Sequence, residues 1–321
     1  MKRFLPFILS LTVYGCVEHL IFVRVLPSGD AEITITSRGD STDIRDDDFL
    51  HPQLSPWHQE VHREKKDDEI VLVQVSTAIL QSDTIPLPGR TGPGIQTYSI
   101  RMQKNRGWFV TTYRFRERFK GRELYIKSPR LATAIGNNEA ADSTQWETEA
   151  LNYIFHSAID DLDQDSALVL PYGMPDRIKT HFTNYLAHVE ALKVYEELSQ
   201  QPDVMLRKIL SPFLPDLPDE YIPRFRDAMQ PYEQDIATSY HLNDDQFTVA
   251  VILPGQVYST NADTIAGDTL KWSFSVEAFI NDDLILDATS MVISPASFQR
   301  TVVFATLILV IVFFMGWKLK K

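Results

Sequence analysis

Residues 20–37 read LIFVRVLPSGDAEITITS, and this stretch decides the fold class because it joins two strand patterns through a turn. Residues 20–26 form an apolar run rich in side chains that favour strands. Residues 31–37 alternate Ile33 and Ile35 with polar neighbours, which is the period of a half-buried strand. The sequence Pro-Ser-Gly-Asp at 27–30 is typical of a turn. We therefore expect a β-hairpin at the start of the folded region.

The same reading continues along the chain. Strand patterns occur at 69–80, 97–104, 108–119, 246–253, 269–278 and 284–293, and helical patterns at 147–162, 176–200, 204–210 and 220–240. The charged segment 40–68 indicates a loop or a helical excursion. Strands, then helices, then strands, without βαβ alternation, predict an α+β fold. The expected architecture is an antiparallel sheet of hairpins with an inserted α-helical segment and a C-terminal transmembrane helix.

The N-terminus has the pattern of a secretory signal. Met1-Lys2-Arg3 is followed by an apolar run at 4–14 that is too short to span a bilayer. The run ends in Val-Tyr-Gly-Cys at 13–16, which looks like the lipobox of a bacterial lipoprotein and implies acylation of Cys16 after cleavage. An uncleaved signal-anchor and a plain buried thiol remain the alternatives.

The C-terminus predicts a second membrane attachment. Residues 301–317 are almost wholly apolar and would extend about 26 Å as a helix. Starting at Phe298, with Arg300 reaching outward, brings the segment close to the roughly 30 Å hydrocarbon core. The lysines beyond Trp317 favour a cytoplasmic tail. We therefore expect the bulk of the chain on the extracytoplasmic side of the bacterial cytoplasmic membrane.

These patterns divide the chain into six predicted segments. They are a lipoprotein-type signal peptide (1–15), a β-rich first part of the exported domain (16–145), a helical insert (146–241), closing strands (242–297), a transmembrane helix (298–317) and a cytoplasmic tail (318–321).

Composition excludes several classes of protein. A net charge of −12 with 44% hydrophobic residues is typical of a folded chain and opposes a general affinity for nucleic acid. A single cysteine excludes a disulfide framework and a multi-cysteine metal cluster. The sequence has no nucleophile elbow, phosphate-binding loop or dinucleotide fingerprint. We accordingly expect no catalytic residues, no cofactor and no nucleic-acid partner.

Two segments resemble metal sites incompletely. His58 and His62 are spaced as in a zinc protease, but Gln59 stands where the catalytic glutamate belongs. Residues 161–165 begin like a calcium loop, yet Ser166 replaces its turn glycine and Tyr172 its bidentate glutamate. Exposed histidines in a charged loop, with His51 nearby, are the preferred interpretation of the first segment, and the second departs too far from a calcium loop. No metal site is therefore predicted.

One charge pattern is unusual. Between Arg101 and Arg130 the chain has ten basic residues against Glu117 and Glu123, a net charge of +8 in an acidic protein. A strand over 108–119 puts Phe109, Tyr113, Phe115 and Phe119 on one face and Arg114, Arg116, Arg118 and Lys120 on the other. The basic face could pair with the acidic helices or protect an exposed sheet edge. The sharper hypothesis is that these four residues contact anionic lipid headgroups or a ligand.

Three segments also resemble a known family. Residues 26–35 (LPSGDAEITI), 253–263 (LPGQVYSTNAD) and 267–272 (GDTLKW), together with the two terminal patterns, look like the LppM-like family of membrane-anchored bacterial lipoproteins. This resemblance implies an α+β fold of lipid-binding type and a role at the cell envelope, and it implies no reaction. The leading prediction is a non-catalytic lipoprotein that binds an envelope lipid or another hydrophobic ligand near the membrane surface. The alternative is a structural or assembly protein that binds an envelope protein through its helical insert, chiefly through residues 176–200.

Overall fold

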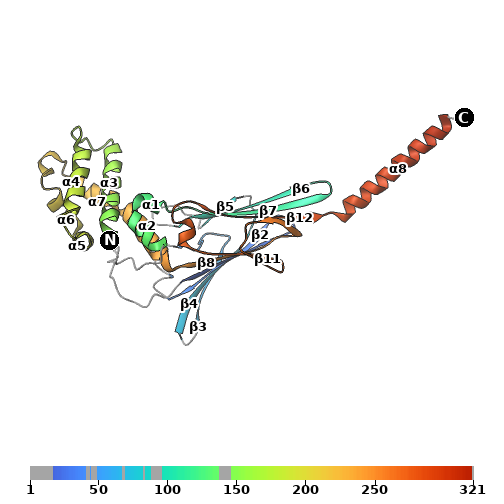
Figure 1. Cartoon of the computed structure of the whole chain (residues 1–321), viewed down its shortest axis with the longest axis horizontal. Coiled ribbons are helices and arrows are strands. Elements are labelled where there is room, and N and C mark those ends of the chain that lie inside the picture. Colours follow the sequence, from blue (N-terminus) through green and yellow to red (C-terminus); the bar gives the residue numbers. More distant parts are fainter. Residues whose placement is uncertain are drawn as a thin grey trace.

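The computed structural model describes residues 17–40, 44, 49–66, 69–81, 84–87, 96–136 and 146–319 of the chain. Two β-sheets form the centre of the molecule, and Figure 1 shows helices α1–α7 at one end and helix α8 projecting from the other. The protein therefore mixes helices and sheets, but it has two sheets in place of the single one expected from the sequence.

The first sheet contains the predicted opening hairpin. Its order is β10 (Thr264–Ala266), β11 (Thr269–Ser275), β8 (Gln246–Ile252), β1 (Glu18–Val25), β2 (Ala31–Gly39), β4 (Glu69–Leu80) and β3 (His58–Lys66). Strands β1 and β2 pair antiparallel, as predicted, and Gly29 in their turn has a φ of 104°, which other residues rarely adopt. Strand β8 joins β1 in parallel, because the chain returns to this sheet only after the long helical segment.

The second sheet contains the basic strand. Its order is β5 (Thr84–Leu87), β6 (Tyr98–Arg106), β7 (Val110–Phe119), β12 (Leu284–Ile293) and β9 (Gln256–Thr260). The predicted strands at 97–104 and 108–119 are confirmed and form the hairpin of β6 and β7. The predicted strand at 284–293 is also confirmed, and it pairs with β7 along its whole length. Aromatic contacts join the two sheets, since Phe115 of β7 lies 6.0 Å from Trp272 and Phe119 lies 6.0 Å from Phe247 between ring centroids.

The helical segment lies between β7 and β8 in the chain. It comprises α1 (Leu124–Lys127), α2 (Pro129–Gly136), α3 (Glu147–Gln164), α4 (Met174–Leu186), α5 (Ala191–Gln200), α6 (Pro202–Ile209) and α7 (Tyr221–His241). The single helix expected over 176–200 is wrong, because the chain breaks between α4 and α5. The region 40–68 also differs from expectation, because its second half forms the edge strand β3.

The prediction of a transmembrane helix over 298–317 is wrong. Helix α8 spans Pro295–Leu319, yet within the described part of the chain no helix is long and apolar enough to cross a membrane. Side chains of α8 are described from Gln299 to Ile311, and the apolar stretch 302–311 among them is about 15 Å long. That is half of the roughly 30 Å hydrocarbon core. The cytoplasmic placement of residues 318–321 depended on this helix and loses its support.

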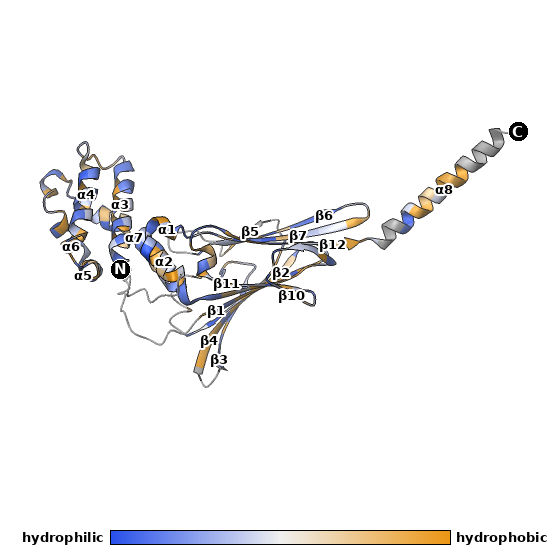
Figure 2. Ribbon diagram, viewed as in Figure 1, coloured by the Kyte–Doolittle hydropathy of each residue, from blue (hydrophilic) through white to orange (hydrophobic). Residues whose placement is uncertain are grey.

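Helix α8 is nevertheless strongly apolar where it is described. Figure 2 colours much of it as hydrophobic, and its large side chains from Val302 to Ile311 are exposed. The helix starts directly after β12, at the end of the molecule opposite the α1–α7 segment (Figure 1).

Candidate functional site

Strand β7 presents alternate residues to opposite sides of the second sheet, as the sequence predicts. Arg114, Arg116 and Arg118 point to solvent, and each side chain is about half exposed. Their neighbours Phe115 and Glu117 point into the core. The predicted basic residues therefore share one surface.

Two carboxylates of the neighbouring chain segment partly neutralise this surface. Asp287 on β12 accepts hydrogen bonds from Arg114 Nη2 at 2.9 Å and from Arg116 Nε at 3.0 Å. Asp283 accepts one from Arg118 Nε at 2.7 Å. Burial raises the pKa of Asp283, but the Gly121 amide and Arg118 outweigh it, so the pKa lies below its usual value. The three arginines therefore pair with Asp287 on β12 and with Asp283 directly before that strand, and not with carboxylates of the acidic helices.

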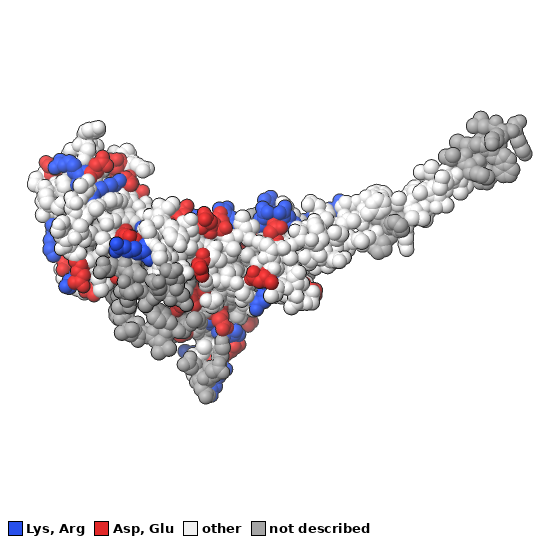
Figure 3. Space-filling view, in the orientation of Figure 1, with Lys and Arg blue, Asp and Glu red and all other residues white. Residues whose placement is uncertain are grey.

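Cations remain in excess on this surface. Arg101 of β6 lies directly opposite Arg116 in the sheet register, and Lys120 follows β7 beside Asp283. We call Arg101, Arg114, Arg116, Arg118 and Lys120 the cationic face. Within the described residues, no ion pair joins Arg101 or Lys120 to a carboxylate. Figure 3 shows basic side chains with acidic ones beside them along the side of the molecule where β5–β7 lie.

Glu117 is a carboxyl residue among the inward-facing aromatic side chains of β7. It is 0% exposed, and within the described structure neither carboxylate oxygen has a hydrogen-bond partner. Burial raises its pKa to about 8, so the carboxyl is mostly protonated at neutral pH. The Tyr98 hydroxyl on the adjacent strand is similarly buried without a described partner. Glu117 therefore does not neutralise the cationic face, although the sequence count of +8 includes its charge.

A buried chain of hydrogen bonds crosses the first sheet, and sequence reasoning missed it. Asp245 Oδ2 lies 3.1 Å from His19 Nε2, and His19 Nδ1 lies 2.7 Å from Ser37 Oγ. Ser37 Oγ lies 2.7 Å from His51 Nε2, and His51 Nδ1 lies 2.9 Å from Ser76 Oγ. These five side chains come from β1, β2, β4, the residue before β8 and the segment after Phe49. All five are buried.

Two proton arrangements satisfy every bond of this chain. With His19 neutral, each hydroxyl or ring N–H donates toward Asp245, from Ser76 through His51, Ser37 and His19. With His19 protonated, both of its ring nitrogens donate, and the bonds beyond Ser37 reverse. Burial, and then the nearby His19, lower the pKa of His51 to about 3, so His51 stays neutral in both arrangements.

The order Asp245, His19, Ser37 is that of a nucleophilic relay, but its surroundings favour a structural role. Ser37 is 2% exposed, and its hydroxyl is held by both imidazoles, which leaves no approach for a substrate in this conformation. These hydrogen bonds instead hold His51, and with it the segment that begins at Phe49, against the inner face of the first sheet. Phe49 adds a ring contact to His19 at 4.2 Å between centroids.

The incomplete metal motifs form no common site. His58 and His62 lie on β3, where four residues extend about 13 Å, and they bond Glu60 and Glu64 respectively. Throughout the described ranges no group of three histidine, cysteine or carboxylate side chains could hold a metal ion. His51, expected near this pair, belongs to the buried chain.

The acidic residues at 161–165 are also occupied elsewhere. Asp161 accepts a hydrogen bond from the Tyr232 hydroxyl at 2.7 Å, and Asp165 pairs with Arg224 at 2.6 Å. Residues 161–164 lie within α3 and Asp165 directly follows this helix, so most of the segment is helical and not a loop. At the N-terminus, residues 1–16 lie outside the described residues, so the signal peptide and the acylation of Cys16 stay predictions.

The comparisons with known proteins found little. No family model matches the chain, and no curated protein matches it. Among solved structures, the chain is weakly similar to the folded domain of LppM from Mycobacterium tuberculosis, with a TM-score of 0.31 and 10% sequence identity. That match covers 90% of this chain and 97% of the other. A likeness of this size carries no argument about fold or function.

Proposed function

We propose that this chain is a non-catalytic protein of the bacterial cell envelope whose cationic face contacts anionic lipid headgroups. The envelope location rests on the sequence alone, through the signal pattern at 1–15 and Cys16. The lipid contact rests on the arrangement of charge on the second sheet.

The observation that carries the proposal is a repulsive cross-strand pair. Arg101 and Arg116 stand directly opposite each other on β6 and β7, an arrangement that destabilises a sheet. Asp287 offsets part of this repulsion, but it is already shared by Arg114 and Arg116. An external anion would relieve the remaining repulsion.

The number of cations is sufficient for binding to a membrane surface. Each basic residue near an anionic bilayer contributes about 1 kcal/mol. Five cations with two carboxylates leave three charges in excess, which would supply about 3 kcal/mol by that measure. The contribution would fall steeply with salt, because the charges are exposed.

The alternative function, binding of an envelope protein through the helical insert, has weaker support. The apolar stripe of residues 176–200 suggested a docking surface. Ile178, Phe182 and Leu186 of that stripe are fully or almost fully buried within the molecule. They are therefore occupied by the chain's own core and unavailable to a partner in this conformation.

The test is vesicle binding of the full chain with two cations neutralised. Arg101→Gln/Lys120→Gln removes charge without leaving Asp283 or Asp287 unpaired. Binding to vesicles of phosphatidylcholine and phosphatidylglycerol in equal parts, measured by flotation, should weaken about 30-fold. Vesicles of pure phosphatidylcholine should show no such difference between the variant and the wild type.

The matched control is Arg207→Gln/Lys271→Gln, which removes the same two side-chain types at exposed positions on α6 and β11. It should retain nearly the binding of the wild type. Equal losses in the two variants would mean that only net charge matters, and would refute a role for the cationic face.

A further inference from the structure

The β6–β7 hairpin ends in an exposed aromatic pair. Trp108 is 67% exposed and Phe109 is 42% exposed, although both belong to residue types that normally bury most of their surface. The turn is held by a bond of 2.8 Å in which the Gly107 amide donates to the Val110 carbonyl oxygen. The two rings are thus displayed on an ordered turn.

The start of helix α8 is fastened to this turn. The Trp108 indole N–H donates to Thr301 Oγ1 at 2.8 Å, and the Ser294 amide donates to the Phe109 carbonyl oxygen at 2.8 Å. Ile293, 65% exposed, lies opposite Val110 in the sheet register. Strand end, hairpin turn and helix start therefore form one surface.

We call this surface the apolar end of the molecule. Its members share large, exposed apolar side chains within the two connected segments; they are Trp108, Phe109, Ile293, Val302, Val303 and Phe304. Figure 2 shows hydrophobic residues at the tip of the β6–β7 hairpin, at the end of β12 and along α8.

The charged residues of the two segments that form the apolar end all have one sign. Between residues 99 and 116 every charged residue is basic, and between residues 288 and 311 Arg300 is the single charged residue. Arg106 and Arg300 flank the apolar side chains and are exposed. This is unusual in a chain with a net charge of −12.

An anionic bilayer surface matches this combination of side chains. Tryptophan favours the boundary between headgroups and hydrocarbon, and arginine can keep its charge among phosphates while its stem stays in apolar surroundings. The apolar end also lies next to the cationic face along β7. Val110 directly follows Phe109, and Arg114 lies about 13 Å further along the strand. Both surfaces can therefore meet one bilayer when this end of the molecule approaches it first.

We propose that the apolar end, led by Trp108 and Phe109, enters the interfacial layer of an anionic bilayer. This inference rests on the proposed function, since it names the part of the molecule that penetrates the surface which the cationic face attracts. The contact adds a term that salt does not screen, because burial of apolar area does not depend on charge.

The first experiment measures vesicle binding of full-chain variants at high salt, with the equal mixture of phosphatidylcholine and phosphatidylglycerol. Trp108→Ser/Phe109→Ser should weaken binding about tenfold through the lost apolar contact. The matched control is Val169→Ser/Tyr172→Ser, which replaces an aliphatic and an aromatic side chain in the exposed connection between α3 and α4. The control should bind as the wild type does.

The second experiment locates Trp108 directly. Vesicles with acyl chains brominated near the headgroup should quench the fluorescence of the wild type more than that of Trp108→Phe, which retains an apolar ring. Trp57→Phe, which removes an indole close to β3, should leave the amount of fluorescence lost to quenching unchanged. Circular dichroism of each variant checks that the fold is retained.

The outcomes separate this inference from the proposed function. If Trp108→Phe and the wild type are quenched equally, the apolar end does not enter the bilayer, whatever the cationic face does. If quenching identifies Trp108 but Arg101→Gln/Lys120→Gln binds normally, the cationic face is refuted and the apolar end stands. If the wild type does not bind either kind of vesicle, both proposals fail.

Discussion

Glu117 shows how one side chain can link the stability of this fold to pH. Its carboxyl lies at 0% exposure between Phe115 and Phe119 on the inward side of β7. Burial raises its pKa from 4.5 to about 8, so folding opposes its ionisation. The unfolded chain loses this proton above about pH 4.5, whereas the folded chain keeps it. Glu117 is therefore compatible with the fold at low pH, and its contribution to stability is lost as pH rises toward 8.

The corresponding prediction concerns Glu117→Gln. The wild type should lose about 1.4 kcal/mol of unfolding free energy per pH unit relative to this variant between about pH 5 and pH 8. Urea unfolding of both proteins at several pH values measures the difference. Glu196→Gln, an exposed change on α5, is the control and should track the wild type. Parallel curves for the wild type and Glu117→Gln would contradict the prediction.

His51 also makes the stability of the wild type depend on pH. The effect of Glu117 is therefore measured as the difference in unfolding free energy between the wild type and Glu117→Gln at each pH. Burial and the nearby His19 lower the pKa of His51 to about 3. Between about pH 3 and pH 6.5 the unfolded chain therefore binds a proton at His51, whereas the folded chain does not. That effect raises stability as pH rises from about 3 to 6.5. Between 4.5 and 6.5 the contributions of Glu117 and His51 oppose each other, and the difference between variants isolates Glu117.

At the residue scale the sequence could predict which face of a strand a side chain occupies, but not which side chain it bonds. The two-residue period places Glu117 on the same face as Phe115 and Phe119, so its burial was readable from the alternation. His19 and Ser37 similarly stand on the inward period of β1 and β2. Their connection to Asp245 depends on β8 pairing with β1 across the whole helical segment, which no local pattern encodes.

At the scale of elements, a buried cluster of three charged side chains fixes helix α7 to the end of the second sheet. Arg122, just after β7, donates from Nη2 to Asp235 Oδ1 at 2.8 Å, and Lys127 of α1 donates to Asp235 Oδ2 at 2.7 Å. Arg122 also bonds Ser239 Oγ at 3.0 Å, one helical turn further along α7. All three charged side chains are largely buried. Removing one member leaves the others desolvated without compensation.

We therefore expect Asp235→Ala to lower the unfolding free energy by about 3 kcal/mol or more, as measured in urea. The same helix supplies the comparison. Asp227 pairs with Arg226 on the solvent side of α7, and such surface pairs contribute about 0–1 kcal/mol. Asp227→Ala should thus change stability little. Similar losses of unfolding free energy in the two variants would show that the buried charges stabilise the fold no more than a surface pair does.

The helical elements also show where periodicity misleads. The stripe over 176–200 is helical on both sides of the break, but its phase changes: Ile178, Phe182 and Leu186 are buried in α4, and Val194 and Leu198 in α5. Leu192, near the start of α5, is exposed. The chain turns between 187 and 190 so that α5 presents a new face to the core. A pattern that tolerates spacings of three or four hides such a change of phase.

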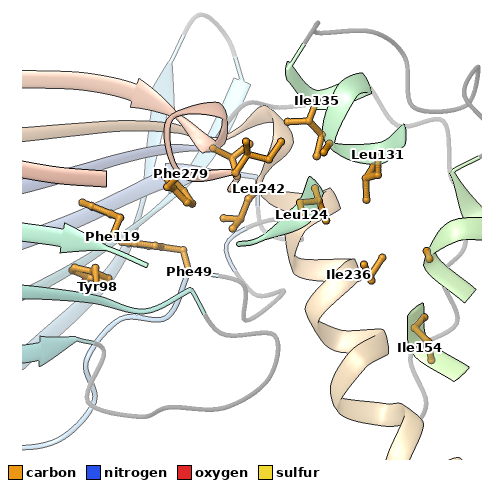
Figure 4. Close-up of a cluster of buried hydrophobic side chains, with 14 of the residues drawn as sticks. Phe49, Tyr98, Phe119, Leu124, Leu131, Ile135, Ile154, Ile236, Leu242 and Phe279 are labelled. Atoms are coloured by element: carbon orange, nitrogen blue, oxygen red, sulfur yellow. The ribbon is translucent and has the colours of Figure 1, made fainter. Parts of the chain in front are cut away.

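At the scale of the whole molecule, one buried apolar cluster extends through both sheets into the helical segment. Figure 4 shows Tyr98 and Phe119 on the sheet side, Phe279 and Leu242 in the middle, and Ile236 on α7. The sequence indicated strands and helices separately. It could not show that β12 inserts between β7 and β9 while β8 joins β1, because each pairing connects distant parts of the chain.

Continuity of the core predicts that sheets and helices unfold together. The Phe119 ring lies 5.3 Å from Tyr98, 5.0 Å from Phe274 and 5.8 Å from Phe279 between centroids. Phe119→Ala should therefore cost about 3–5 kcal/mol. Because the damaged cluster reaches α7 through Leu242, the loss should lower the unfolding midpoint of helices as much as that of sheets.

Two probes test this coupling in the same urea titration. Far-ultraviolet circular dichroism follows mainly the helices, and tryptophan fluorescence includes Trp272, which is buried between the sheets and donates to Asn261 Oδ1 at 3.0 Å. Phe119→Ala should move both midpoints equally. Leu192→Ala, a change at an exposed position of α5, should move neither. If only the fluorescence midpoint moved, the sheets and the helical segment would be separate cooperative units, because a shared core transmits the loss of one ring to every element packed on it.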